Sequence, residues 1–133
     1  MSQETVEVVR GFWRAWEGGD LGGVLALVDP DVVTERMHPA PDAQVYAGRE
    51  GMVQAAVDWI ENFGEFVITG EEFFAAGGDQ VVVRIHQEAT GDLSRVPVSA
   101  DFWFVHAVRD GAIARLDMYL SKAQAFDAVG LPG

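Results

Sequence analysis

A change of periodicity marks the second half of the chain, where residues 66–120 read FVITGEEFFAAGGDQVVVRIHQEATGDLSRVPVSADFWFVHAVRDGAIARLDMYL. Apolar and polar side chains alternate in this segment with the period of two that is typical of β-strands. Groups of glycine and aspartate interrupt the alternation, and such residues favour tight hairpin turns. The segment therefore predicts an antiparallel meander of four long strands, at residues 66–75, 80–90, 96–109 and 112–120.

Helical patterns precede and follow this meander. Apolar side chains recur at helical spacing in the first part of the chain, and Gly18-Gly19 ends the first such run. Asp20 and Ser121 are expected to cap short helices, and Pro30 to prevent the second helix from continuing. The predicted elements are helices at residues 4–17, 21–28, 49–63 and 121–129, a short strand at 32–35 and a loop at 37–47. Helices grouped before a sheet indicate an α+β fold.

The composition fits one soluble domain spanning residues 1–133. The chain has 133 residues, nine Lys and Arg, 21 Asp and Glu, a net charge of −12 and no cysteine. This acidic balance repels phosphate backbones and anionic lipid, so neither nucleic acid nor a membrane is expected as a partner. The three histidines show no metal-ligand spacing, and nucleotide-binding motifs are absent, so no metal and no cofactor are expected. The first residues do not read as a signal peptide, which favours a cytoplasmic location.

Several short segments resemble one known family. They read YAGRE at residues 46–50, VRDGAI at 108–113 and QAFDAVGL at 124–131. Together with the order of the elements, they resemble the NTF2-like superfamily and, within it, SnoaL-like domains related to polyketide cyclases and ketosteroid isomerases. The resemblance implies a cone-shaped fold, in which three N-terminal helices and a short strand pack on a curved antiparallel sheet of four long strands. It also implies a deep hydrophobic pocket, but no single activity, because this fold hosts many.

The positions that carry acids and bases in related enzymes are mostly occupied by other residues here. Arg36 matches the position of the carboxylate base of ketosteroid isomerases, and Phe12 matches that of their tyrosine. Asp101 is a possible match for their second oxyanion donor, depending on strand register. Met118 matches the acid of the polyketide cyclases, and Asp117, one residue earlier, is expected to point to the opposite face of its strand.

Arg84 and His86 provide the closest partial match to a catalytic pair. Limonene epoxide hydrolases carry an Arg-x-Asp pair on the equivalent strand, and here the second residue is His86. Alternation places Arg84, His86 and Glu88 on one face of their strand. Two interpretations stay open: a charge ladder on a solvated face, or a polar cluster inside the pocket.

The abundance of aromatic residues predicts an apolar pocket for a small, cyclic molecule. His38 belongs to this set because its loop is expected near the pocket mouth. The expected ligand-binding residues are Phe12, Trp16, Arg36, His38, Trp59, Phe63 and Met118. Residues 101–105 carry large side chains on both faces of one strand, which favours a homodimer through the sheet.

The leading hypothesis is therefore a pocket enzyme of the SnoaL-like group that acts by general acid–base chemistry as an isomerase, cyclase or hydrolase. In it His86 transfers the proton and Arg84 stabilises an anion, and Asp101 is the third catalytic candidate, as a possible oxyanion donor. The alternatives are a non-catalytic module that binds a small hydrophobic ligand, and a dimeric interaction protein.

Overall fold

The structure of the protein, a computed structural model, describes residues 2–38, 44–91 and 97–132. Within these ranges the chain forms four helices and six strands. The helices are α1 (Ser2–Glu17), α2 (Leu21–Ala26), α3 (Gly48–Ile60) and α4 (Lys122–Val129). The strands are β1 (Val28–His38), β2 (Val45–Ala47), β3 (Phe63–Ala76), β4 (Gln80–Gly91), β5 (Pro97–Arg109) and β6 (Ala112–Tyr119).

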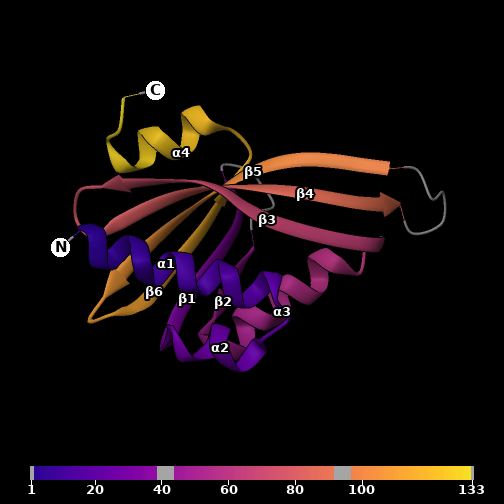
Figure 1. The fold of residues 1–133 in the computed structure, drawn as a ribbon, viewed down its shortest axis with the longest axis horizontal. Helices are drawn as coiled ribbons and strands as arrows, with labels where there is room; N and C mark the ends of the chain where they lie inside the picture. The colour runs from indigo at the N-terminus through magenta and orange to yellow at the C-terminus, as the bar shows by residue number, and fades with distance from the viewer. Residues whose placement is uncertain (1, 39–43, 92–96, 133) are drawn as a thin grey trace.

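All six strands join one sheet in the order β2-β1-β6-β5-β4-β3. β1 and β6 run parallel, and the other neighbouring strands are antiparallel. Figure 1 shows α4 on one side of this curved sheet and α1, α2 and α3 on the other. We call the side of α1–α3 the inner face and the side of α4 the outer face. The predicted α+β class, the order of the predicted elements and the four-strand meander are confirmed, and β2 is an additional strand.

The first strand is longer than predicted. It spans Val28–His38 rather than residues 32–35, and its pairing with β6 shifts register between Val28 and Val33. Pro30 falls inside this irregular stretch, where its missing N–H group interrupts no regular ladder. Strand β2 was also not predicted, since it lies in the expected loop. Residues 39–43 of that loop lie outside the described residues.

The third helix ends earlier than predicted, at Ile60 rather than residue 63. Asn62 explains the end, because its side-chain amide donates to the backbone oxygens of Asp58 and Trp59 at 3.0 and 3.2 Å. Such local side-chain bonds compete with a continuing helix. Phe63 therefore begins strand β3 instead of ending a helix. The predicted caps are confirmed: Asp20 accepts from the backbone N–H of Gly23, and the side chain of Ser121 accepts from that of Gln124.

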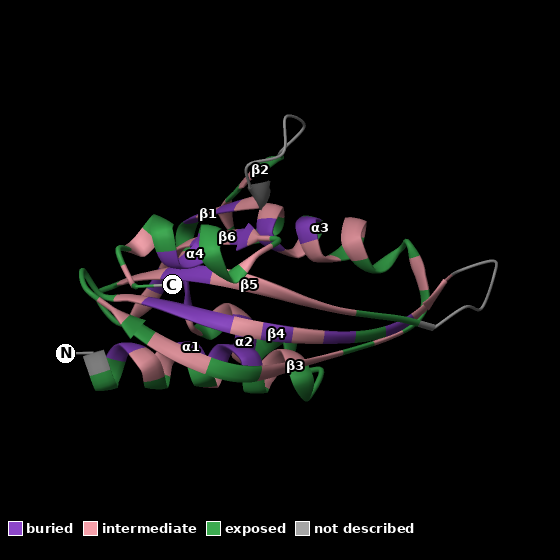
Figure 2. Cartoon of the chain, turned by 90° about the horizontal axis from the view of Figure 1, so that it is seen from above, coloured by how far each residue is buried: buried purple, intermediate pink, exposed green. Residues whose placement is uncertain are grey.

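The main core lies on the inner face, between the sheet and the first three helices. β4 contributes Val81, Val83 and Ile85 to it, and Figure 2 shows buried stretches along this strand. A smaller core lies on the outer face, where α4 covers part of the sheet. It contains Val82, Val105, Ala125 and Phe126. Among the described residues, no helix is both long and apolar enough to cross a membrane.

Candidate binding pocket

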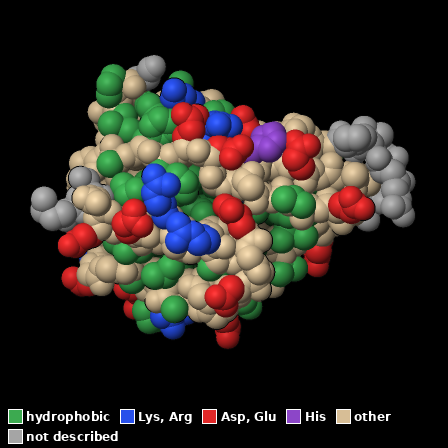
Figure 3. All heavy atoms as spheres, viewed as in Figure 1, with side chains coloured by type: hydrophobic (Ala, Val, Ile, Leu, Met, Phe, Trp, Pro, Cys, Tyr) green, Lys and Arg blue, Asp and Glu red, His purple; other side chains and the backbone are tan. Residues whose placement is uncertain are grey.

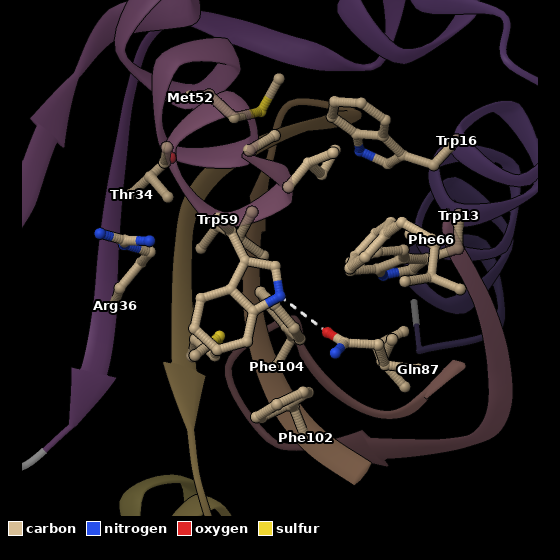
Figure 4. Close-up of a pocket in the computed structure, with 17 residues that line it drawn as sticks. Trp13, Trp16, Thr34, Arg36, Met52, Trp59, Phe66, Gln87, Phe102 and Phe104 are labelled. Atoms are coloured by element: carbon tan, nitrogen blue, oxygen red, sulfur yellow. Dashed lines mark hydrogen bonds between the residues drawn. The ribbon is translucent and has the colours of Figure 1, made fainter. Parts of the chain in front are cut away.

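A pocket of about 110 Å³ lies between the inner face of the sheet and helices α1 and α3. Its walls are built from aromatic rings, aliphatic side chains and a few polar groups, as Figure 4 shows. The lining residues are Trp13, Trp16, Thr34, Arg36, Met52, Ala55, Ala56, Trp59, Ile60, Phe66, Ile68, Ile85, Gln87, Phe102, Phe104, Leu116 and Met118. Such a lining is typical of sites for small, mainly apolar molecules.

Arg36 is the one charged side chain among the described residues that line this pocket. Its Nη2 group donates to Gln44 Oε1 at 2.6 Å and to Tyr46 Oη at 3.1 Å. The Nε group is buried and has no hydrogen-bond partner within the described residues. One edge of the guanidinium is therefore held by the protein, while Nε keeps a donor that no described group uses.

Tyr46 and Asp58 support the guanidinium from outside the pocket. Tyr46 Oη donates to Asp58 Oδ2 at 2.9 Å. Burial, together with the hydrogen bond to Asp58, raises the pKa of Tyr46, so its hydroxyl stays protonated near neutrality. Arg49 ties the same segment to the other end of β1, since its Nε and Nη2 groups donate to the backbone oxygen of Val28 at 3.1 and 2.8 Å. The YAGRE segment thus contacts β1 near both of its ends.

Thr34 is a second polar group of the lining with unused hydrogen-bonding capacity. It lies two residues before Arg36 on β1, so both side chains stand on the inner face. Thr34 is 4% exposed, and its Oγ1 atom has no partner in the described part of the chain. A buried hydroxyl without a partner costs free energy, roughly 1–3 kcal/mol. Thr34 and Arg36 together offer two adjacent donors to a molecule in the pocket.

Gln87 and Trp59 form a polar contact across the pocket. Trp59 Nε1 donates to Gln87 Oε1 at 2.7 Å, the dashed line of Figure 4. Gln87 is 1% exposed. The bond fixes the indole plane of Trp59, which also meets Phe102 edge-to-face with ring centroids 5.2 Å apart. These two contacts hold the indole of Trp59 in one orientation within the aromatic wall.

The expected ligand-binding residues are only partly found in the lining. Trp16, Arg36, Trp59 and Met118 line the pocket, as predicted. Phe12 does not: it is fully buried in the core, where its ring meets those of Trp13 and Trp16 edge-to-face.

Phe63 is also outside the lining, and it packs beside it against the rings of Trp59 and Phe66. His38 ends strand β1, and its side chain lies outside the described residues.

Of the two interpretations left open for Arg84 and His86, the polar cluster inside the pocket is contradicted, since neither residue belongs to the lining. Ile85 and Gln87 of the same strand line the pocket, so the alternating Arg84 and His86 stand on the outer face. Asp101 lies directly opposite His86 in the β4–β5 register and shares that face. The solvated charge ladder is therefore the correct interpretation, because helices α1 and α3 cover the more apolar face of β4.

These outer-face side chains form a connected network of ion pairs. Arg84 contacts Glu72 at 2.8 Å and Asp101 at 3.4 Å. His86 donates from Nδ1 to Asp101 at 2.7 Å and from Nε2 to Glu88 at 2.6 Å. Two carboxylate partners require both ring nitrogens to carry protons, and the hydrogen bonds to Asp101 and then Glu88 raise the pKa of His86. In Figure 3 a histidine lies at the surface among acidic and basic side chains.

Asp117 also faces away from the pocket. Its carboxylate accepts from Arg115 Nε at 3.0 Å, and Arg115 Nη2 donates to Glu35 at 2.8 Å. The next residue, Met118, lines the pocket. The strand register thus places neither Asp101 nor Asp117 at the site.

Sequence reasoning missed the two polar groups that matter most, Thr34 and Gln87. The alternation of side chains along the strands also indicates the faces of these two residues. Thr34 shares a face with Arg36, and Gln87 shares a face with Ile85. Following the apolar side of β4, rather than its charged side, identifies Gln87, and Thr34 follows from its place on the same face of β1 as Arg36.

His106 belongs to the core and not to the pocket lining. It is fully buried, and Trp13 Nε1 donates to its Nε2 at 2.8 Å, while its Nδ1 bonds to the backbone oxygen of Val81 at 3.1 Å. Both ring nitrogens are therefore satisfied by a neutral imidazole. Burial lowers the pKa of His106 to about 4.

The geometry defines an α+β domain with an apolar, cation-bearing pocket, and comparison with known proteins gives its family. The family model of the SnoaL-like domain matches residues 9–116, so the chain belongs to the SnoaL-like domain family. None of the curated proteins compared with the chain matches it.

Solved structures with the same fold are numerous, and three illustrate the likeness. An NTF2-like protein of unknown function from Burkholderia pseudomallei is 20% identical with a TM-score of 0.74, over 95% of this chain and 97% of that one. TerC, crystallised with polyporic acid, has the same four values. A Mycobacterium tuberculosis protein in complex with estradiol-17beta-hemisuccinate is 22% identical with a TM-score of 0.69, over 90% and 95% of the two chains. Identities this low establish the shared fold alone.

Proposed function

We propose that this SnoaL-like domain binds a small, largely apolar molecule whose carboxylate, or another oxyanion, accepts hydrogen bonds from Arg36 and Thr34. The observation that carries the proposal is the pair of buried donors, Arg36 Nε and Thr34 Oγ1, which have no partner among the described residues and lie in a mainly apolar lining. An anion in a low-dielectric site gains most from such charge-assisted bonds. The crystallisation of TerC with polyporic acid and the complex of the Mycobacterium protein with estradiol-17beta-hemisuccinate support a ligand in this fold.

The size of the pocket sets the size of the group that it encloses. An engineered cavity of about 150 Å³ holds benzene, and this pocket measures about 110 Å³. One ring therefore fits with small adjustments of the lining side chains. The edges and faces of Trp59, Phe102 and Phe104 suit a flat aromatic ring.

Binding without catalysis is the favoured role. General acid–base catalysis needs a proton-transferring group within hydrogen-bond reach of the reacting atom. Among the described residues, the lining contains no carboxylate and no imidazole. This is why we propose the binding module in place of the acid–base enzyme built on His86. Turnover of a panel of epoxides, enones and lactones would contradict this choice.

We further propose that the protein is cytoplasmic and forms a homodimer through its sheet.

A matched pair of ligands tests the proposal. Benzoate is expected to bind about tenfold more tightly than benzamide, since a charged acceptor adds about 1 kcal/mol or more to each hydrogen bond. Isothermal titration calorimetry measures both affinities, and quenching of the three lining tryptophans, Trp13, Trp16 and Trp59, reports the site. Equal affinities, or no binding of either compound, would refute the proposed anion site.

The substitution Thr34→Val is expected to change stability and binding in opposite directions. Valine keeps the shape of the side chain and removes the buried hydroxyl that lacks a partner, so the free energy of unfolding should rise by about 1 kcal/mol. Benzoate should bind roughly fivefold more weakly, because it loses one donor. Urea unfolding and calorimetry measure the two effects. A variant that is less stable than the wild type would show that Thr34 Oγ1 is satisfied in the free protein.

A further inference from the structure

A second hollow, of about 220 Å³, lies on the surface between α3 and the α1–α2 turn. We call it the helix groove. Its lining carries no charge, and Leu21, Val57 and Ile60 are 45%, 39% and 39% exposed. The lining residues are Trp16, Gly19, Leu21, Val53, Ala56, Val57 and Ile60. Exposed apolar side chains gathered in a hollow mark a surface that contacts another apolar group.

The helix groove adjoins the pocket through shared walls. Trp16, Ala56 and Ile60 line both hollows, so a single layer of side chains separates them. In Figure 4 Trp16 lies on the opposite side of the pocket from Arg36. The pocket is therefore polarised, with its cation at one end and the wall shared with the groove at the other.

The small volume of the pocket limits how much of a ligand it can enclose. About 110 Å³ encloses one ring, so any longer ligand must leave the pocket on some side. At the Trp16 end it would meet the continuous apolar surface of the helix groove. An apolar chain placed there stays out of water, and each buried methylene favours binding.

We infer that the natural ligand is an elongated amphipathic carboxylate whose apolar chain passes between Trp16 and Ile60 into the helix groove. The inference rests on the proposed function, because it takes the carboxylate end to be at Arg36. The ring or first carbons fill the pocket, and the chain points away from the carboxylate. Because the groove adjoins the pocket, we infer that the groove binds part of the ligand and not a separate protein partner.

Two probes that differ only in the chain test this inference. Benzoate reports the pocket alone, whereas 4-hexylbenzoate also reaches beyond it. We expect 4-hexylbenzoate to bind the wild-type protein at least tenfold more tightly, since burying even a few methylenes gives such a factor. The double variant Leu21→Gln/Val57→Gln makes the groove polar without touching the pocket lining, and it should lose most of that gain while its affinity for benzoate stays the same.

Val67→Gln is the matched control, because Val67 is 61% exposed and lies outside both hollows. It should leave both affinities at wild-type values. If the Leu21→Gln/Val57→Gln variant keeps the full gain in affinity from the hexyl chain, the inference is overturned. An equal loss of affinity for benzoate and 4-hexylbenzoate in that variant would also overturn it. If benzoate itself fails to bind the wild type, the proposed function fails instead. Circular dichroism confirms that each variant is folded.

Discussion

Replacing Arg36 by glutamine is expected to weaken the binding of benzoate about 10- to 100-fold. A hydrogen bond to a charged group contributes roughly 1.5–3 kcal/mol in proteins, and glutamine can supply only a neutral donor. Among the described residues, Arg36 is the one charged side chain of the lining, so no neighbouring cation replaces it. Calorimetric titration with benzoate measures the change. Benzamide, which carries no charge, should lose far less affinity in the same variant.

Arg84→Gln is the matched control for Arg36→Gln, because both variants remove one arginine charge from the same sheet. Arg84 lies on the outer face, where it pairs with Glu72 and Asp101. Its removal should leave the affinity for benzoate within about twofold of wild type, since charges separated by the sheet and by solvent are screened. A loss in Arg84→Gln as large as that in Arg36→Gln would contradict the anion site and point to a general effect of net charge.

Acidification from pH 6.5 to pH 5 is expected to cost the folded protein about 1.5 kcal/mol through His106 alone. Burial lowers the pKa of this imidazole to about 4, whereas an unfolded histidine titrates near 6.5. The unfolded state therefore takes up the proton first, and stability falls as the pH drops below about 6.5 and levels off below about 4. Urea unfolding at a series of pH values measures this slope. In His106→Gln the slope between pH 6.5 and 5 should be much shallower, whatever the absolute stability of the variant.

His86→Gln is the control for this pH dependence. Hydrogen bonds to Asp101 and Glu88 raise the pKa of His86, so its contribution is present below about pH 6.5 and disappears as the pH rises through the raised value. Removing it should therefore leave the slope on the acid side unchanged. A flat acid slope in His86→Gln, with the slope retained in His106→Gln, would show that the two assignments are reversed.

The meander could be predicted because its signals are local. The turn at Asp110-Gly111 has positive φ values of 53° and 77°, which aspartate and glycine tolerate better than other residues. The alternation in β4 likewise determined which side chains share a face. The boundary errors have local causes that the pattern did not reveal, such as the capping side chain of Asn62.

The sequence of a single strand does not show which of its two faces lines the pocket. Alternation groups Arg84 with His86, but only the packing of α1 and α3 decides whether that group meets the pocket or solvent. The resemblance of Arg84 to the arginine of limonene epoxide hydrolases favoured a position inside the pocket. The apolar side chains that alternate with Arg84 and His86 favoured the opposite arrangement, in which the apolar side chains face the pocket. Burying the apolar side is the energetically stronger effect, since a buried charge without a partner costs far more than a solvated one. The hydrogen bonds that hold Arg36 come from Gln44 and Tyr46, and the alternation within β1 does not reveal them.

The hydrogen bonds from Arg36 to Gln44 and Tyr46 also affect the entropy of recognition. A free arginine side chain has about 2 kcal/mol of rotamer entropy, and a binding event that orders it must overcome that loss. Here folding has already restricted the side chain, with Tyr46 anchored in turn by Asp58. In the proposed complex, an arriving anion would therefore meet a donor that is ordered in advance. Tyr46, which lies outside the pocket lining, would then affect how tightly the anion is held.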